Sequence, residues 1–197
     1  LSKTNVKVIA MGKATFWNTN RGDTFMMSNC FNCEFIGFDF FGWRTTNTPL
    51  GTNFTAFWSV FNRDCKILNC NFVNVGNHCI TEGQGTFQQT TNMEVANNRF
   101  FNCGSWFDGP GFTGYDGSCV QPGSYWKVHH NKFIECAIPM EWFGNINTAV
   151  VIGTEISDNY IENYIKWGIA DAGITNNYYH TFRRNTIYQN DSMRTVS

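Results

Sequence analysis

Short stretches in which apolar and polar residues alternate recur along the chain at intervals of 26 to 37 residues. One of them is Cys70-Asn71-Phe72-Val73-Asn74-Val75. Alternation with a period of two predicts a β-strand with one buried face, and Phe72 and Val75 both face inward only if the chain turns near Val73-Asn74. Each copy is therefore expected to form a short strand, a tight turn and a second strand. The copies are centred on the apolar residues Phe35, Phe72, Phe100, Phe133, Ile161 and Ile187.

A repeated core with variable spacing is typical of a solenoid, whose strands stay in register while its loops absorb insertions. An Asn or a Cys stands two residues before each central apolar residue. Asn tolerates the left-handed backbone of a turn, and its amide can pair with equivalent amides above and below. We therefore expect one stacked column made of Cys33, Cys70, Asn98, Asn131, Asn159 and Asn185.

A second set of positions supports the same register, because a small residue followed by a large aliphatic one comes after each repeat. A β-sandwich would show turns every 8–12 residues or so without an in-phase Asn column. The sequence thus predicts an all-β fold, a single-stranded parallel β-helix of about six to seven coils with long loops. Residues 1–197 are expected to be one β-helix domain and a piece of a longer chain. The second set comprises Cys79-Ile80, Cys119-Val120, Pro139-Met140 and Gly168-Ile169.

The composition narrows the classes of partner. A formal net charge of -1 without a basic cluster argues against nucleic-acid binding, which needs a positive surface. No apolar run approaches the roughly 20 residues of a membrane-spanning helix. The 19 Phe, 7 Trp and 7 Tyr residues argue against disorder.

The pattern resembles the pectin-lyase-like family of right-handed parallel β-helices, in particular the trunk of bacteriophage tailspike and appendage proteins. The resemblance lies in the run from Asn5 to Phe16, which is similar to the first coils of such a trunk, and in the following rung from Cys33 to Phe40. It implies a right-handed solenoid, a homotrimer and a place in the virion, with folding in the host cytoplasm. It does not choose among lyases, hydrolases, epimerases and receptor-binding trunks, because one fold hosts many functions.

The eight cysteines are expected to be reduced core residues rather than a disulfide framework. Cys103 and Cys136 are predicted to occupy one column in consecutive coils, as are Cys79 and Cys119, and Cys33 and Cys70. Cys30-x-x-Cys33 has the spacing of a metal knuckle but lacks a second pair, so no metal and no cofactor are expected.

Three acids follow the second set of positions: Glu82, Glu141 and Asp171. If the coils align, these carboxylates form one acidic stripe, with Gln121 in place of an acid in the intervening coil. Glycoside hydrolysis uses two carboxylates, and His78, just before Cys79, is the histidine best placed for acid–base chemistry. The alternative is a solvated outer face, where acids are common.

The insertion between Gly104 and Ser124 combines aromatic rings with acids, which is the composition of a carbohydrate groove. Burial between protomers would select the same residues. The predicted substrate-binding residues are Trp106, Asp108, Tyr115, Asp116, Trp142 and Trp167, with Trp126 as a neighbouring wall.

These observations predict a tailspike-like β-helix that binds a bacterial surface polysaccharide and depolymerises it by carboxylate-assisted hydrolysis. Two alternatives stay open: a microbial polysaccharide lyase or epimerase, and a non-catalytic shaft or adhesin.

Overall fold

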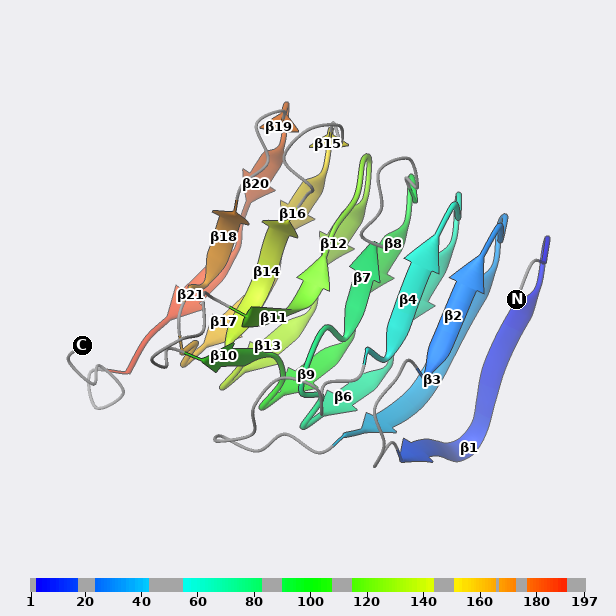
Figure 1. Ribbon diagram of the computed structural model, residues 1–197, viewed down its shortest axis with the longest axis horizontal. Helices are drawn as coiled ribbons and strands as arrows, with labels where there is room; N and C mark the ends of the chain where they lie inside the picture. Colours follow the sequence, from blue (N-terminus) through cyan, green and yellow to red (C-terminus); the bar gives the residue numbers. More distant parts are fainter. Residues whose placement is uncertain are drawn as a thin grey trace.

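The computed structural model describes residues 3–17, 24–42, 55–82, 90–107, 115–143, 151–165, 167–172 and 177–190. These residues form strands and no helix, and the strands stack side by side into a parallel β-helix (Figure 1). The predicted all-β solenoid is therefore confirmed. It has about five turns, slightly fewer than the six to seven expected.

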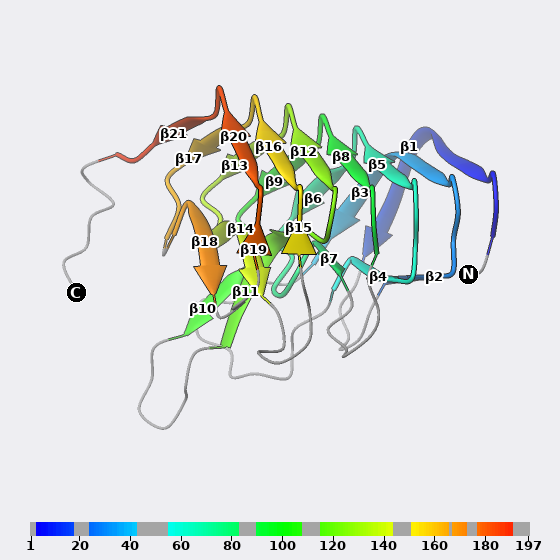
Figure 2. The same cartoon turned by 90° about the horizontal axis from the view of Figure 1, so that it is seen from above.

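Each turn contributes one strand to each of three stacks, which run along the solenoid from the N-terminal to the C-terminal end (Figure 2). We name these stacks the front sheet, the first ladder and the second ladder. The front sheet contains β2 (Phe25–Ser28), β4 (Phe57–Val60), β7 (Ile80–Glu82), β11 (Tyr115–Gln121), β14 (Ile138–Phe143) and β18 (Ile169–Ala172).

The two ladders follow one another in each turn. The first ladder contains β5 (Lys66–Leu68), β8 (Glu94–Ala96), β12 (Lys127–His129), β16 (Glu155–Ser157) and β20 (Thr181–Arg183). The second contains β6 (Asn71–Val73), β9 (Arg99–Phe101), β13 (Lys132–Ile134), β17 (Tyr160–Glu162) and β21 (Thr186–Tyr188). At the N-terminal end both ladders join β3 (Glu34–Phe41), which pairs with β1 (Lys7–Trp17). A short pair, β15 (Val151–Ile152) and β19 (Asn177–Tyr178), lies outside these stacks.

The corner between the two ladders is made by one left-handed residue in every turn. Such a backbone is tolerated by Asn and Asp and is free of cost for Gly. In β1 and β3 the corner residue is a glycine, so the strand bends and continues. The column consists of Gly12, Gly37, Asn69, Asn97, His130, Asp158 and Arg184, all with φ between 52° and 82°.

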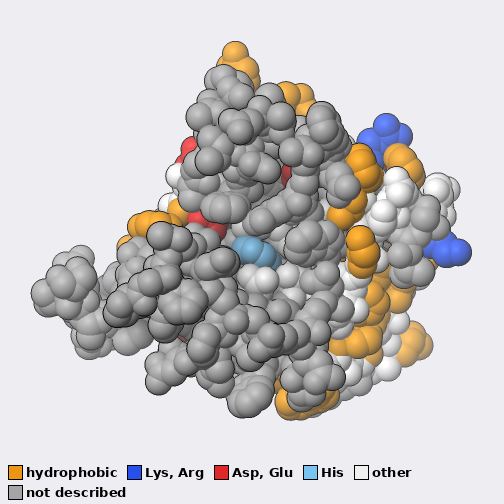
Figure 3. All heavy atoms as spheres, in the orientation of Figure 1, with side chains coloured by type: hydrophobic (Ala, Val, Ile, Leu, Met, Phe, Trp, Pro, Cys, Tyr) orange, Lys and Arg blue, Asp and Glu red, His pale blue; other side chains and the backbone are white. Residues whose placement is uncertain are grey.

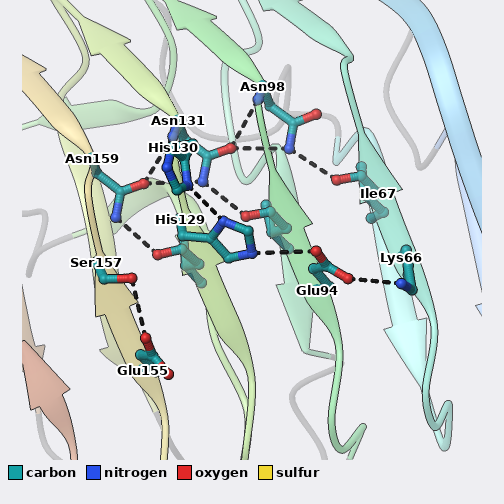
Figure 4. Close-up of polar contacts among 12 residues, drawn as sticks. Lys66, Ile67, Glu94, Asn98, His129, His130, Asn131, Glu155, Ser157 and Asn159 are labelled. Atoms are coloured by element: carbon teal, nitrogen blue, oxygen red, sulfur yellow. Dashed lines mark hydrogen bonds and ion pairs between the residues drawn. The ribbon is translucent and has the colours of Figure 1, made fainter.

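Directly after this corner runs the predicted asparagine ladder (Figure 4). The Asn131 Oδ1 atom accepts hydrogen bonds from the backbone N–H and the side chain of Asn98, at 2.9 and 3.1 Å. The Asn131 amide in turn donates to Asn159 Oδ1 at 3.0 Å and to the Val95 carbonyl at 2.8 Å. The same pattern continues to Asn185, and Cys70 ends the ladder by donating its N–H to Asn98 Oδ1. The buried amides thus satisfy one another and the backbone.

One part of the predicted register is wrong. Phe35 pairs with Ile67 in the first ladder, whereas Phe40 pairs with Phe72 in the second. Cys33 consequently lies level with Cys65 and not with Cys70. The reason is the corner at Gly37, where β3 bends and continues from the first ladder into the second. The sequence of β3 therefore lacks the corner Asn that indicates the turn in the later repeats.

The interior is a continuous apolar column. The rings of Phe40, Phe72, Phe100 and Phe133 stack with centroids 5.0, 4.8 and 4.6 Å apart and planes within 8° of parallel. Offset stacking adds about 0.5–1.5 kcal/mol per pair beyond the area buried. All eight cysteines are free and buried, which confirms the expected reduced core thiols.

Candidate functional site on the front sheet

The front sheet carries almost all of the predicted site residues. Asp108 lies outside the described residues. For three further residues the structure describes the backbone but not the side chain: Trp106, Tyr115 and Asp116. The elements concerned are β7 with Glu82, β10 (Ser105–Phe107) with Trp106, β11 with Tyr115 and Asp116, β14 with Glu141 and Trp142, β18 with Asp171, and the segments before β7 and β18 with His78 and Trp167.

The second set of positions, on which the site was predicted, is confirmed. Ile80 pairs with Val120, Val120 with Met140, and Met140 with Ile169. Figure 3 shows a histidine and acidic side chains on this face of the molecule. The register therefore brings the predicted site residues to one sheet of the solenoid.

The expected single acidic stripe is divided by this register. Glu141 pairs with Ala170, whereas Asp171 pairs with Trp142 and lies in the column of Glu82. Successive side chains of a strand point to opposite faces, so Glu141 faces away from that column. With strands about 4.8 Å apart, Glu82 lies about 10 Å from the level of Glu141 and about 14 Å from that of Asp171. Both spacings exceed the roughly 5–9.5 Å that separates the two carboxyl groups of glycosidases.

Glu82 has the most unusual environment of the three acids. Its Oε2 atom is buried and has no hydrogen-bond partner among the described residues; it lies 1.8 Å from where a Cβ on Gly123 would stand, close to the Trp126 indole. Burial disfavours the charged carboxylate and raises the pKa of Glu82 from 4.5 to about 8. The side chain is therefore predominantly a neutral acid at pH 7 and carries a proton that it can donate.

Further polar groups of the front sheet are buried as well. Within the part of the chain that the structure describes, the Gln121 Nε2 atom on β11 and the Trp142 Nε1 atom on β14 have no hydrogen-bond partner. Gln121 lies in the column of Glu141, and Trp142 lies in that of Glu82. The Thr81 hydroxyl contacts Gln121 Oε1, and Glu141 is fully buried. Buried polar groups are nearly always paired in folded proteins, so unpaired ones on three neighbouring strands require an explanation.

His78 is held by the adjacent coil. His78 Nδ1 lies 3.2 Å from the Ser118 backbone nitrogen, which can donate to it, and 3.3 Å from the Ser118 carbonyl oxygen, which can accept from it. The Ser118 hydroxyl oxygen is also 3.2 Å from Nδ1. The sequence analysis did not identify Ser118. Ser118 precedes Cys119 just as His78 precedes Cys79. Aligning the two cysteines would therefore have placed Ser118 beside His78.

The aromatic residues divide between the surface and the core. Trp167 is exposed, whereas Trp142 is buried and its ring lies 4.8 Å from that of His180. His180 was not predicted, and burial lowers its pKa, an effect opposed by the nearby Asp171 carboxylate. Trp126 is not a groove wall, because it is fully buried in the solenoid and donates from Nε1 to the Thr90 carbonyl at 2.8 Å.

The strand β10 pairs antiparallel with β11 and forms a ribbon that leaves the body of the solenoid (Figure 2). In this ribbon Trp106 lies opposite Asp116, and Phe107 lies opposite Tyr115. The ribbon begins where backbones meet closely, because a Cβ on Gly104 would lie 2.2 Å from the Gly117 carbonyl oxygen. Glycine at both positions is what allows the insertion to leave the coil here.

Within the described part of the chain, no group of three or more His, Cys, Asp or Glu side chains is arranged to hold a metal ion. The same residues include no helix long and apolar enough to cross a membrane. Comparison with known proteins found no matching family model, no matching curated protein and no matching solved structure.

Proposed function

We propose that this chain is a glycan-binding β-helix that engages a bacterial surface polysaccharide on its front sheet. The observation that carries the proposal is the set of buried, unpartnered polar groups on β7, β11 and β14. The resemblance to tailspike trunks adds the setting to the proposal: a homotrimer in a phage tail, acting outside the cell on its host's surface.

The chemistry of the front sheet suits a sugar. Hydroxyl groups both donate and accept hydrogen bonds, so they pair with an exposed carboxylate such as that of Asp171. Aromatic rings such as that of Trp167 bind the apolar faces of sugar rings. The front sheet runs along the axis of the solenoid, which fits a linear polymer better than a compact ligand.

Binding is tested with purified capsular and cell-wall polysaccharides in an affinity assay on the full chain. Trp167→Ala and Asp171→Asn alter exposed side chains at the C-terminal end of the front sheet and are expected to weaken binding at least tenfold. The matched control is Trp17→Ala, an exposed tryptophan that lies on β1 instead. Equal effects of Trp17→Ala and Trp167→Ala would place binding elsewhere.

Hydrolysis is a second candidate function, favoured by the raised pKa of Glu82. A neutral carboxylic acid can protonate the leaving oxygen of a glycosidic bond while a carboxylate activates water, which is the division of roles in glycosidases.

New reducing ends after incubation with a bound polysaccharide would establish hydrolysis, and Glu82→Gln is then expected to abolish cleavage while retaining binding. An unsaturated product that absorbs in the near ultraviolet would instead identify a lyase. Binding with neither product would identify the adhesin or shaft.

A further inference from the structure

Four of the eight cysteines gather at one place in the interior. Cys79 and Cys119 occupy one column in consecutive turns, since the Cys79 N–H donates to the Cys119 carbonyl at 3.1 Å. Cys103 and Cys136 occupy a second column, with the Ala137 N–H bonded to the Cys103 carbonyl at 2.8 Å. All four residues are fully buried. We name this group the thiol quartet.

The two columns flank the turn between the second ladder and the front sheet, where their thiols face each other, and the chain visits the columns alternately. The thiol of Cys103 lies close enough to interact with each of the other three thiols of the quartet, and it donates to the backbone carbonyls of Phe72 and Phe101 at 3.3 Å. The thiol of Cys119 likewise contacts all three of the others. Cys103 and Cys119 are therefore the central pair, and each comes from a different column.

The other cysteines are arranged differently. Cys30, Cys33 and Cys65 lie together near the N-terminal end, where the Cys65 thiol donates to the Cys30 carbonyl at 3.5 Å. Cys70 stands apart in the corner column, and its thiol donates to the Leu68 carbonyl at 3.3 Å. Among the described residues, only the quartet joins four thiols, all of them linked through Cys103 and Cys119.

We infer that the thiol quartet is an oxidation site, in which Cys103 and a thiol of the facing column form an internal disulfide when the folded protein meets hydrogen peroxide. The two Cβ atoms of a disulfide lie about 3.5–4.5 Å apart, which is less than the strand spacing of about 4.8 Å. Neighbours within one column point the same way and stay at that spacing. Thiols from facing columns converge, so the cross-column pairs meet the requirement better.

The environment of the quartet also points to Cys103 as the attacking thiol. Burial opposes ionisation of Cys103, but the hydrogen bonds from three neighbouring thiols outweigh it, and the pKa of Cys103 is lowered. Burial raises the pKa of Cys79 and of Cys119. The thiolate is the nucleophilic form of cysteine, so the proton is lost most readily at the centre of the group.

The chemistry balances with peroxide as the only oxidant. The Cys103 sulfur attacks one peroxide oxygen, the O–O bond breaks, and a sulfenic acid and one water molecule result. A facing thiol then attacks the sulfenic sulfur and expels a second water molecule as the S–S bond forms. Two thiols are oxidised by two electrons, and peroxide is reduced to two water molecules.

The test treats the full, folded chain with hydrogen peroxide, quenches the reaction, and alkylates the free thiols in denaturant. Intact mass and peptide mapping are expected to show six alkylated cysteines in place of the original eight, with Cys103 linked to Cys79 or Cys119. A reductant should restore all of the thiols. Cys70→Ala is the matched control, because it removes a buried cysteine outside the quartet and should leave the cross-link unchanged.

Cys103→Ala should abolish the cross-link, and mapping of the unsubstituted chain gives an independent answer if that variant does not fold. Retention of eight free thiols after peroxide treatment overturns the inference. So does a cross-link that lacks Cys103, or one that forms only after the chain is unfolded before oxidation.

Discussion

At the scale of single residues, asparagine contributes to the corner in two ways. Asn97 and Asn69 take the left-handed backbone of the corner, and the residue that follows, such as Asn98, sends its amide along the axis. Each ladder amide satisfies a backbone carbonyl below it and an equivalent amide above it. The recurrence of Asn in the sequence is thus explained by buried hydrogen bonding rather than by loop chemistry.

Loss of one ladder amide is expected to be costly. Asn131→Ala removes the acceptor of the buried Asn98 N–H and the donor to the Val95 carbonyl. We expect the free energy of unfolding to fall by about 2–4 kcal/mol, because both groups stay buried without a partner. Denaturant titration measures the change. Asn71→Ala, on the outer face, should alter stability by no more than about 0.5 kcal/mol, and an equally small change for Asn131→Ala would contradict the account.

Glu82 should make stability depend on pH in a definite direction. Its folded-state pKa of about 8 exceeds the ordinary value of 4.5, so the folded chain holds the proton more tightly than the unfolded chain between these pH values. The free energy of unfolding is therefore expected to decrease as pH rises from 4.5 to 8, by at most about 1.4 kcal/mol per pH unit.

Glu82→Gln should remove this contribution and make the chain more stable than the unsubstituted protein above pH 8. Denaturant titrations across the range, with infrared detection of a protonated carboxyl group near pH 7, measure both effects. A carboxyl band that survives in Glu82→Gln would assign the proton to another residue.

At the scale of elements, the same corner is built in two ways. Where Asn, Asp, His or Arg occupies it, the strand breaks into two, as with β5 and β6. Where Gly37 or Gly12 occupies it, one long strand bends through the corner. Apolar and polar residues continue to alternate through such a bend, so the sequence shows no break between the two ladders. For this reason the pattern placed Phe35 in the second ladder, where the structure has Phe40. Only the pairing of β3 with β5 and β6 corrects this.

The ribbon of β10 and β11 depends on two backbones meeting closely at Gly104. Gly104→Ala should destabilise the chain by several kcal/mol, because its Cβ would meet the Gly117 carbonyl oxygen and the backbone has φ +78°. Gly12→Ala is a matched control, since Gly12 has φ +82° with no atom within 4 Å of the added Cβ. We expect Gly12→Ala to cost only the backbone strain, about 1–2 kcal/mol. Thermal and denaturant unfolding compare the two variants, and equal losses would exclude a role for the close approach.

At the scale of the whole molecule, each turn contacts only its neighbours, so stability is a sum along the axis. The side chains that fill the interior in the middle turns are left open at the C-terminal turn. Ile161 is fully buried, while Ile187, its partner in the adjacent β21, is 51% exposed. Equivalent positions in the repeat therefore contribute unequally in this chain.

The unequal contributions of Ile161 and Ile187 to stability can be measured by replacing each of them with alanine. Ile161→Ala is expected to lower the free energy of unfolding by about 2–4 kcal/mol, because it creates a cavity. Ile187→Ala should cost about 1 kcal/mol, because less apolar surface is removed from contact. Hydrogen exchange should be correspondingly faster in β20 and β21 than in β12 and β13. Uniform protection along the axis would contradict the additive description.

The sequence by itself determined the solenoid, the asparagine column from Cys70 to Asn185, the reduced cysteines and the face that carries the candidate site. These features repeat, and a pattern of period two that returns in every turn is visible without coordinates. The tertiary structure decided the register at the glycine corners, the separation of Glu141 from the column of Glu82, and the burial of Trp126 and Trp142. The physical reason is that register and burial depend on which strands are neighbours and on which residues cover a side chain. The local alternation of apolar and polar residues contains neither kind of information.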